Sequence, residues 1–138
     1  MNSKLFKIMI SSIAVILIVG VGALIYILNS SDGENEELSI EKMVEYSYTT
    51  DEMSTDLKDG SFVRMQFDII TDSKKARTEI ENRSFQFKNI FIKESVNLTE
   101  ADVQAGLTEL ETKLKDQMNE LMDEGNIIDV YIISKVIQ

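Results

Sequence analysis

The chain has 138 residues, with 14 basic and 24 acidic side chains, no histidine, no cysteine and a formal net charge of −10. An acidic balance of this size argues against nucleic acid as a partner. The lack of histidine and cysteine removes the usual zinc ligands, the commonest general base, the thiol nucleophile and any disulfide bond, so much enzyme chemistry is excluded.

The first predicted element is a long apolar stretch near the N-terminus. From Ile8 to Leu28 the sequence holds 21 residues without a charge. As an α-helix this stretch would span roughly 31 Å, close to the hydrocarbon thickness of a bilayer. The sequence therefore predicts a single transmembrane helix over 8–28, whose membrane-spanning positions include Leu17, Gly20 and Gly22.

A cleaved signal peptide is the alternative interpretation of this stretch. Its apolar region would usually run only about 7 to 15 residues and end at a small-x-small cleavage site, and that pattern is weak here. Lys4 and Lys7 are the only charges before Asp32. Because positive charge marks the cytoplasmic flank of a membrane helix, the stub 1–7 is predicted to be cytoplasmic and the C-terminal part extracytoplasmic, at the cell membrane.

Residues 29–45 are polar and acidic and contain no aromatic residue. Such a composition cannot build a core and is typical of a flexible tether. Its carboxylates match no EF-hand spacing, so no metal site is predicted there. We interpret 29–45 as an acidic linker to a folded domain that covers 46–138.

Alternating apolar residues mark the start of this domain. Every second residue from Val63 to Ile69 is apolar, and the residues between them are polar. An Asp-Gly pair at 59–60 separates this run from an earlier alternating run, and that pair is a strong signal of a tight turn between strands. The pattern predicts a β-hairpin over 53–71.

The next segment begins as a helix and continues into a stretch whose periodicity is ambiguous. Asp72 or Ser73 can cap a helix over "KKARTEIENR". In "SFQFKNIFIKESV", Phe85 and Phe87 alternate as in a strand, whereas Phe87 and Phe91 share one face of a helix. A run this short can be either, so the residues alone leave 85–96 open between helix and strand.

A clearer helix is predicted from Thr99, which with Asp102 gives a capping-box-like start. Apolar residues then recur at spacings of four and three: Val103, Leu107, Leu110, Leu114, Met118 and Leu121. This periodicity predicts one helix with a core-facing stripe, with Gly125 placed to cap its C-terminus.

The last predicted element is a strand within "DVYIISKVIQ", residues 129–138. Apolar residues fall on both of its faces, which is typical of a strand inside a sheet or against a partner. We therefore expect a central or interface strand. The predicted fold class is α+β, with a single N-terminal transmembrane helix, an acidic linker, and a small domain in which helices pack on a small β-sheet.

No catalytic or cofactor-binding constellation emerges from the pattern. The carboxylates are scattered, the serines have no histidine to activate them, and no glycine-rich phosphate loop is present. The sequence predicts a protein that is not an enzyme and that uses no cofactor.

Taken together, these segments resemble the FliL family of flagellar basal body-associated proteins. The resemblance covers the full chain and is carried by the basic stub, the anchor, the acidic linker, "ITDSKKARTEIENR", "RSFQFKNIFI", "GNIIDVY" and the final "VIQ". It implies a single-pass protein of the bacterial cell membrane and flagellum basal body, whose domain is similar to the stomatin and prohibitin type. It also implies a helix over 83–96, although Phe85 stands where proline is common and Glu94 where an apolar residue is common.

The resemblance further implies a function. Family members associate with stator units of the MotA/MotB type, support torque, motility and chemotactic control of flagellar rotation, and can assemble into homo-oligomeric rings. For this chain we expect contacts through the membrane helix, an exposed sheet edge and the segment beside the linker, with candidate residues Tyr46, Tyr48, Met53 and Asp56. The alternatives are a membrane-anchored binding or adaptor module unrelated to the flagellum, and a tethered hydrolase with an apolar cleft.

Overall fold

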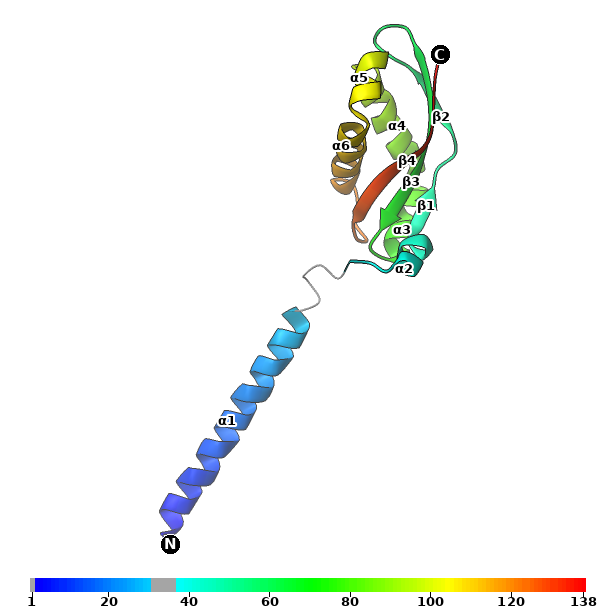
Figure 1. Ribbon diagram of the computed structural model, residues 1–138. Helices are drawn as coiled ribbons and strands as arrows, with labels where there is room; N and C mark the ends of the chain where they lie inside the picture. Colours follow the sequence, from blue (N-terminus) through cyan, green and yellow to red (C-terminus); the bar gives the residue numbers. More distant parts are fainter. Residues whose placement is uncertain (1, 31–36) are drawn as a thin grey trace. The chain divides into compact units, whose positions relative to one another are not determined.

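The computed structural model describes residues 2–30 and 37–138, and the chain divides into two compact units, 1–37 and 38–138 (Figure 1). The described residues of the first unit contain one helix. The second is an α+β domain built on a small antiparallel sheet, which agrees with the predicted fold class.

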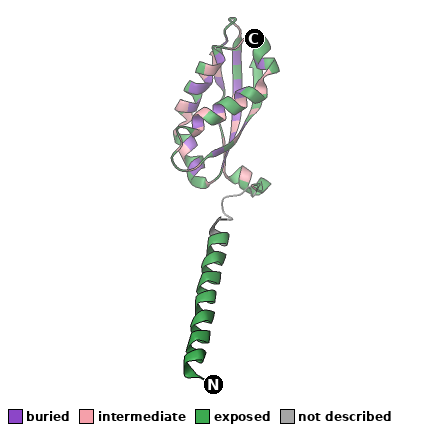
Figure 2. Ribbon diagram, turned by 90° about the vertical axis from the view of Figure 1, so that its left-hand side faces the viewer, coloured by how far each residue is buried: buried purple, intermediate pink, exposed green. Residues whose placement is uncertain are grey.

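Helix α1 (Ser3–Ser30) forms where the sequence predicts a membrane-spanning helix, and it begins before Ile8. From Ser3 to Ile27 it is long and apolar enough to cross a membrane, and the side chains described along it are exposed (Figure 2). The Ser11 hydroxyl donates to the carbonyl of Ile8 at 3.2 Å, so its polar group is satisfied within the helix. A helix that is apolar all round needs an apolar environment, which a bilayer supplies.

Part of the range predicted as linker is helical. Residues 31–36, in the middle of that range, lie outside the described residues, and α2 (Ile40–Glu45) occupies its end. The Ser39 side chain caps α2 by accepting a hydrogen bond from the backbone N–H of Lys42 at 3.4 Å. Six helical residues are too few to establish a period, so the sequence pattern did not indicate this helix.

Strand β3 (Phe62–Thr71) is the centre of the four-stranded sheet. On one side it pairs first with β2 (Met53–Asp56) and further along with β1 (Ser47–Thr49), and on the other side with β4 (Ile127–Ile137). All pairings are antiparallel. The predicted hairpin is confirmed as β2 and β3, joined by a turn in which Gly60 has a φ of +85° that favours glycine.

Among the described strands, β4 pairs with β3 alone, so of the two predicted positions, central or interface, the central one is wrong. The physical reason is that its two apolar faces come from irregular pairing. Register shifts occur between Gln66 and Phe67 and between Ile70 and Thr71, and they leave Ile133 and Ile128 of β4 without a direct partner on β3. Each bulge adds one residue to β4 and so shifts the in-and-out alternation of its side chains by one position. Apolar residues therefore appear on both faces of this edge strand.

Two consecutive helices follow strand β3. Helix α3 (Lys74–Asn82) is capped by Ser73, whose side chain accepts the N–H of Ala76 at 3.1 Å, as predicted. Helix α4 (Ser84–Ser95) follows after Arg83 alone, so the helical alternative for 85–96 is confirmed. It is favoured because a helix points Phe87, Ile90 and Phe91 at the sheet together, whereas strand alternation would put Ile90 on the opposite face from the two phenylalanines.

The long helix predicted after Thr99 is two helices. Thr99 and Asp102 form the expected capping box at the start of α5 (Glu100–Ala105), but the chain leaves helical geometry at Gly106 before α6 (Leu107–Asn119). Glycine is a poor helix former, so interrupting the helix at Gly106 costs little free energy. Leu121, predicted as part of the buried stripe, lies beyond α6 and is exposed.

Gly125 does not cap this helix, because α6 ends at Asn119 and Gly125 lies in the turn before β4. Its φ is +135°, and a Cβ added there would collide with the Asp72 carboxylate. The N–H of the next residue, Asn126, donates to that carboxylate at 3.0 Å. Glycine is thus required by a close approach between the β4 turn and the start of α3.

The core lies between the sheet and helices α3 to α6, which cover one of its faces (Figures 1 and 2). Phe67 at the centre of β3 makes edge-to-face contacts with Phe87 and Phe91 of α4, with ring centroids 5.2 and 5.4 Å apart. The predicted alternating residues of β3, from Val63 to Ile69, are all fully buried on this face. This one-sided cover leaves the second face and the edges of the sheet as candidate contact surfaces.

Candidate functional site

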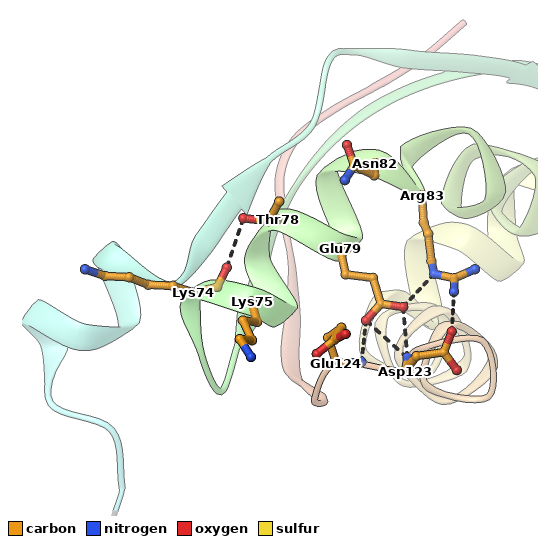
Figure 3. A pocket seen from close by; sticks show the side chains of 8 residues that line it. All are labelled: Lys74, Lys75, Thr78, Glu79, Asn82, Arg83, Asp123 and Glu124. Atoms are coloured by element: carbon orange, nitrogen blue, oxygen red, sulfur yellow. Dashed lines mark hydrogen bonds and ion pairs between the residues drawn. The ribbon is translucent and has the colours of Figure 1, made fainter.

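An open hollow of about 650 Å³ lies beside α3 and is lined by Lys74, Lys75, Thr78, Glu79, Asn82, Arg83, Asp123 and Glu124 (Figure 3). The Glu79 carboxylate accepts hydrogen bonds from the backbone N–H groups of Asp123 and Glu124, at 2.8 and 2.6 Å. It also binds Arg83 Nε at 2.7 Å, and Arg83 reaches the Asp123 carboxylate at 2.8 Å. These polar groups satisfy one another, so the cluster fastens the turn before β4 to α3.

The protonation of Glu79 follows from this arrangement. Partial burial alone would raise the pKa of its carboxyl group, but the two backbone N–H groups and the Arg83 guanidinium favour the charged form. The net result is a lowered pKa. The fastening is therefore made by an ionised carboxylate at neutral pH.

The candidate residues at the start of the domain have different environments. Tyr46 and Tyr48 are half-buried, and Tyr48 packs against the core from β1. Asp56 is exposed at the end of β2. Met53 is only 4% exposed and belongs to the core, so its expected place on an exposed contact surface is not supported. It faces inward because it pairs with Met65, whose side chain points to the helices.

A smaller hollow of about 240 Å³ joins two of these residues to α4. Its lining includes Tyr48 and Met53, together with Asp51, Glu52, Ser84, Phe85 and Lys88. Phe85 is 70% exposed at its rim. Sequence reasoning did not name Phe85 as a contact residue, although one signal was present. Once 84–95 is taken as a helix, Phe85 lies about 200° around the axis from the buried Phe87 and must face outward.

The outer edge of β4 is shielded along its first half by α6. The Asn119 side chain accepts the N–H of Ile127 at 2.7 Å and donates to its C=O at 2.9 Å, as a neighbouring strand would. Glu111 accepts the N–H of Ile132 at 2.9 Å. Side chains eight residues apart on one helix thus occupy the hydrogen-bonding groups of an edge strand, which blocks the addition of another strand there.

The second half of β4 is open. Gln138 and Phe62 exchange both backbone hydrogen bonds, at 2.7 and 2.8 Å. Because antiparallel pairs alternate, the N–H and C=O groups of Lys135 and Ile137 then point to the free edge. Ile133 beside them is 52% exposed, and Val136 is also exposed. This half therefore presents both backbone groups and apolar side chains to a partner.

Comparison with known proteins gives a consistent result. The family described as "Flagellar basal body-associated protein FliL" matches residues 47–138. A curated relative from Bacillus subtilis (strain 168), named "Flagellar protein FliL", is 32% identical over 117 residues, which covers 82% of this chain and 84% of the relative. The family match spans the whole sheet and all the helices from α3 to α6. On this evidence the chain belongs to the FliL family of flagellar basal body-associated proteins.

Proposed function

We propose that this protein is a non-enzymatic accessory protein of the flagellar motor, which associates with stator units and supports torque, motility and chemotactic control of rotation. The observation that carries the proposal is the family match over 47–138, together with a flagellar relative that aligns with most of the chain. The stator units would be of the MotA/MotB type, and the protein acts by binding one of their states more tightly than the other.

The first element of this proposal is the anchor. Helix α1 crosses the cell membrane once, with the stub that carries Lys4 and Lys7 in the cytoplasm and the domain outside. Its charge-free stretch from Ile8 to Leu28 supports this assignment. An anchored domain of this kind meets the extracytoplasmic part of a stator without needing any catalytic group.

The second element is self-association of the domain. The open half of β4 adds a strand or an apolar surface from a second copy, and repetition of a head-to-tail contact closes a ring of stomatin and prohibitin type. The support for this step is the contrast along β4, where only the first half is occupied by α6 side chains. The hollow at Tyr48 and Phe85 is the surface that we assign to the stator.

A deletion strain tests the function directly. Loss of swimming and of stator recruitment, with rescue by the wild-type chain, is the expected result. Phe85→Glu in the rescuing chain should reduce stator recruitment, whereas Val96→Glu, at an exposed position just beyond the same helix, should not. If the deletion strain swims with normal torque and recruits stator units normally, the protein is an adaptor outside the motor and the proposal fails.

A matched pair on β4 tests the self-association. Ile133→Lys places a charge on the open half and should shift the detergent-solubilised full chain toward the monomer in sedimentation. Ile128→Lys places the same charge on a bulged, exposed position of the shielded half and should leave the oligomeric state unchanged. Equal effects of the two substitutions, or a wild-type chain that is monomeric at all concentrations tested, would contradict the assigned surface.

A further inference from the structure

The helix α2 exposes an apolar face that nothing in the domain covers. Ile40 is 74% exposed and Val44 is 69% exposed. Residues four apart lie on the same side of a helix, so the two side chains form one stripe. Apolar side chains gain free energy when they leave water, and a paired stripe on a six-residue helix has no such gain inside this domain.

The orientation of α2 on the domain is fixed by polar contacts on its other sides. Glu45 pairs with Lys74 of α3 at 2.7 Å. The carbonyl of Tyr46, which follows the helix, accepts hydrogen bonds from the N–H and the hydroxyl of Thr71, at 3.2 and 2.7 Å. Since α2 cannot turn its stripe inward without breaking these contacts, the exposure of Ile40 and Val44 is a fixed feature of the folded domain.

Chain length keeps this stripe close to the membrane that the anchor crosses. Nine residues, 31–39, separate the end of α1 from the start of α2. Even a fully extended chain of this length spans no more than roughly 35 Å between Ser30 and Ile40. The same bilayer that holds α1 is therefore always within reach of α2.

Basic and acidic side chains both lie around the stripe. Lys42 on α2 and Lys75 on α3 are exposed, Lys74 pairs with Glu45, and Glu41 is exposed on α2. Basic residues beside an apolar stripe are what an interfacial helix uses to meet anionic headgroups while its apolar side chains enter the acyl boundary.

We propose that α2 docks on the bilayer surface, with Ile40 and Val44 inserted at the headgroup boundary, so that the domain is held against the membrane in a defined orientation. This inference rests on the proposed crossing of the bilayer by α1. Its consequence is geometric: the sheet edges and the Phe85 hollow are presented at a set height above the membrane.

The experiment uses the absence of tryptophan from the chain. Single-tryptophan variants of the full chain, Ile40→Trp, Val44→Trp and Glu41→Trp, are reconstituted into phosphatidylcholine and phosphatidylglycerol vesicles, with or without lipids brominated near the headgroup. The first two should show blue-shifted emission that brominated lipid quenches several-fold more than the emission of Glu41→Trp. Glu41 is the matched control because it lies about 100° around the same helix from Ile40.

A fourth variant, Leu17→Trp, separates failure of this inference from failure of the anchor. If lipid brominated deep in the acyl chains quenches Leu17→Trp, but the positions 40, 41 and 44 all remain unquenched by headgroup-brominated lipid and red-shifted, the anchor is inserted and the docking of α2 is wrong. Blue-shifted emission at positions 40 and 44 without lipid quenching would also overturn the inference, because it would indicate that a second copy of the chain covers the stripe. Leu17→Trp left unquenched by the lipid brominated deep in its acyl chains would instead refute the membrane crossing itself.

Discussion

The two halves of β4 share one strand, one partner strand and a similar apolar content, yet they meet different surroundings. From Ile127 to Ile132, the outer edge is held by Asn119 and Glu111 of α6. From Ile133 to Ile137, the backbone groups of the same edge face outward and the apolar side chains are more exposed. The side chains of α6, and not the sequence of β4, therefore determine which part of the β4 edge can bind a partner.

Removing the Asn119 side chain should give the largest loss of stability among the changes considered. Asn119→Ala leaves both backbone groups of the buried Ile127 without partners, and we expect a loss of about 2 to 3 kcal/mol in the free energy of unfolding. Urea denaturation of the full chain measures it. Asn119→Asp keeps an acceptor for the N–H but has no donor for the C=O, so its stability should lie between those of wild type and Asn119→Ala. A wild-type urea midpoint for Asn119→Ala would show that the contact contributes little.

The same truncation at two valines of β4 compares the halves directly. Val130 is buried in the shielded half and Val136 is exposed in the open half. Val130→Ala should destabilise the domain by roughly 2 kcal/mol through lost burial and a residual cavity. Val136→Ala should change stability by less than about 0.5 kcal/mol. Equal losses at both positions in thermal or urea unfolding would mean that the open half is already covered by another copy.

Replacing Glu111 should have a smaller effect on folding. Glu111→Ala frees the N–H of Ile132 at a half-buried position, with an expected cost of about 1 kcal/mol. Glu111→Gln retains an acceptor oxygen and should restore most of that loss. Because Glu111→Ala also opens more of the edge, its self-association in sedimentation should exceed that of Glu111→Gln. Equal self-association of the two variants would show that Glu111 does not block the edge of β4.

Glu79→Gln should weaken the attachment of the turn before β4 at neutral pH, because the single oxygen of glutamine cannot accept hydrogen bonds from both backbone N–H groups and from Arg83 Nε together. The difference from wild type should shrink on acidification. The folded pKa of Glu79 lies below its usual 4.5, so its contribution is present above about pH 4.5 and is lost as pH falls through the folded value. The variant should therefore lose less stability than wild type as the pH falls below about 4.5 in urea titrations. Glu81→Gln, at an exposed site of the same helix, is the control for removing a carboxylate from α3.

Local chemistry predicted much of this fold. The hairpin around Asp59-Gly60 formed because the turn and the alternation from Val63 to Ile69 agree. The Ser73 and Thr99 caps formed because their oxygens satisfy backbone N–H groups that any helix start leaves unpaired. Among the candidate contact residues, Asp56 is exposed and Met53 is buried, and their contacts with a partner stay a prediction.

The errors share a cause. The close approach of Gly125 to Asp72 and the burial of Met53 against its partner Met65 both depend on residues elsewhere in the sequence. The period of the apolar residues predicts which side chains are buried, but it does not predict which other element packs against them. Phe85 shows the reverse case, because an apolar residue stayed exposed once the helix fixed its direction.

The sequence by itself determined the apolar helix near the N-terminus, the turn and cap positions, the buried face of β3 and the family. These follow from local hydrogen bonding and from the period of the apolar residues. Only the tertiary structure decided that β4 lies at an edge, that α6 shields half of it, and that the stripe of Ile40 and Val44 faces outward. Those outcomes depend on contacts between residues that are far apart in the sequence. The pattern within one segment does not contain the energies of its contacts with other elements.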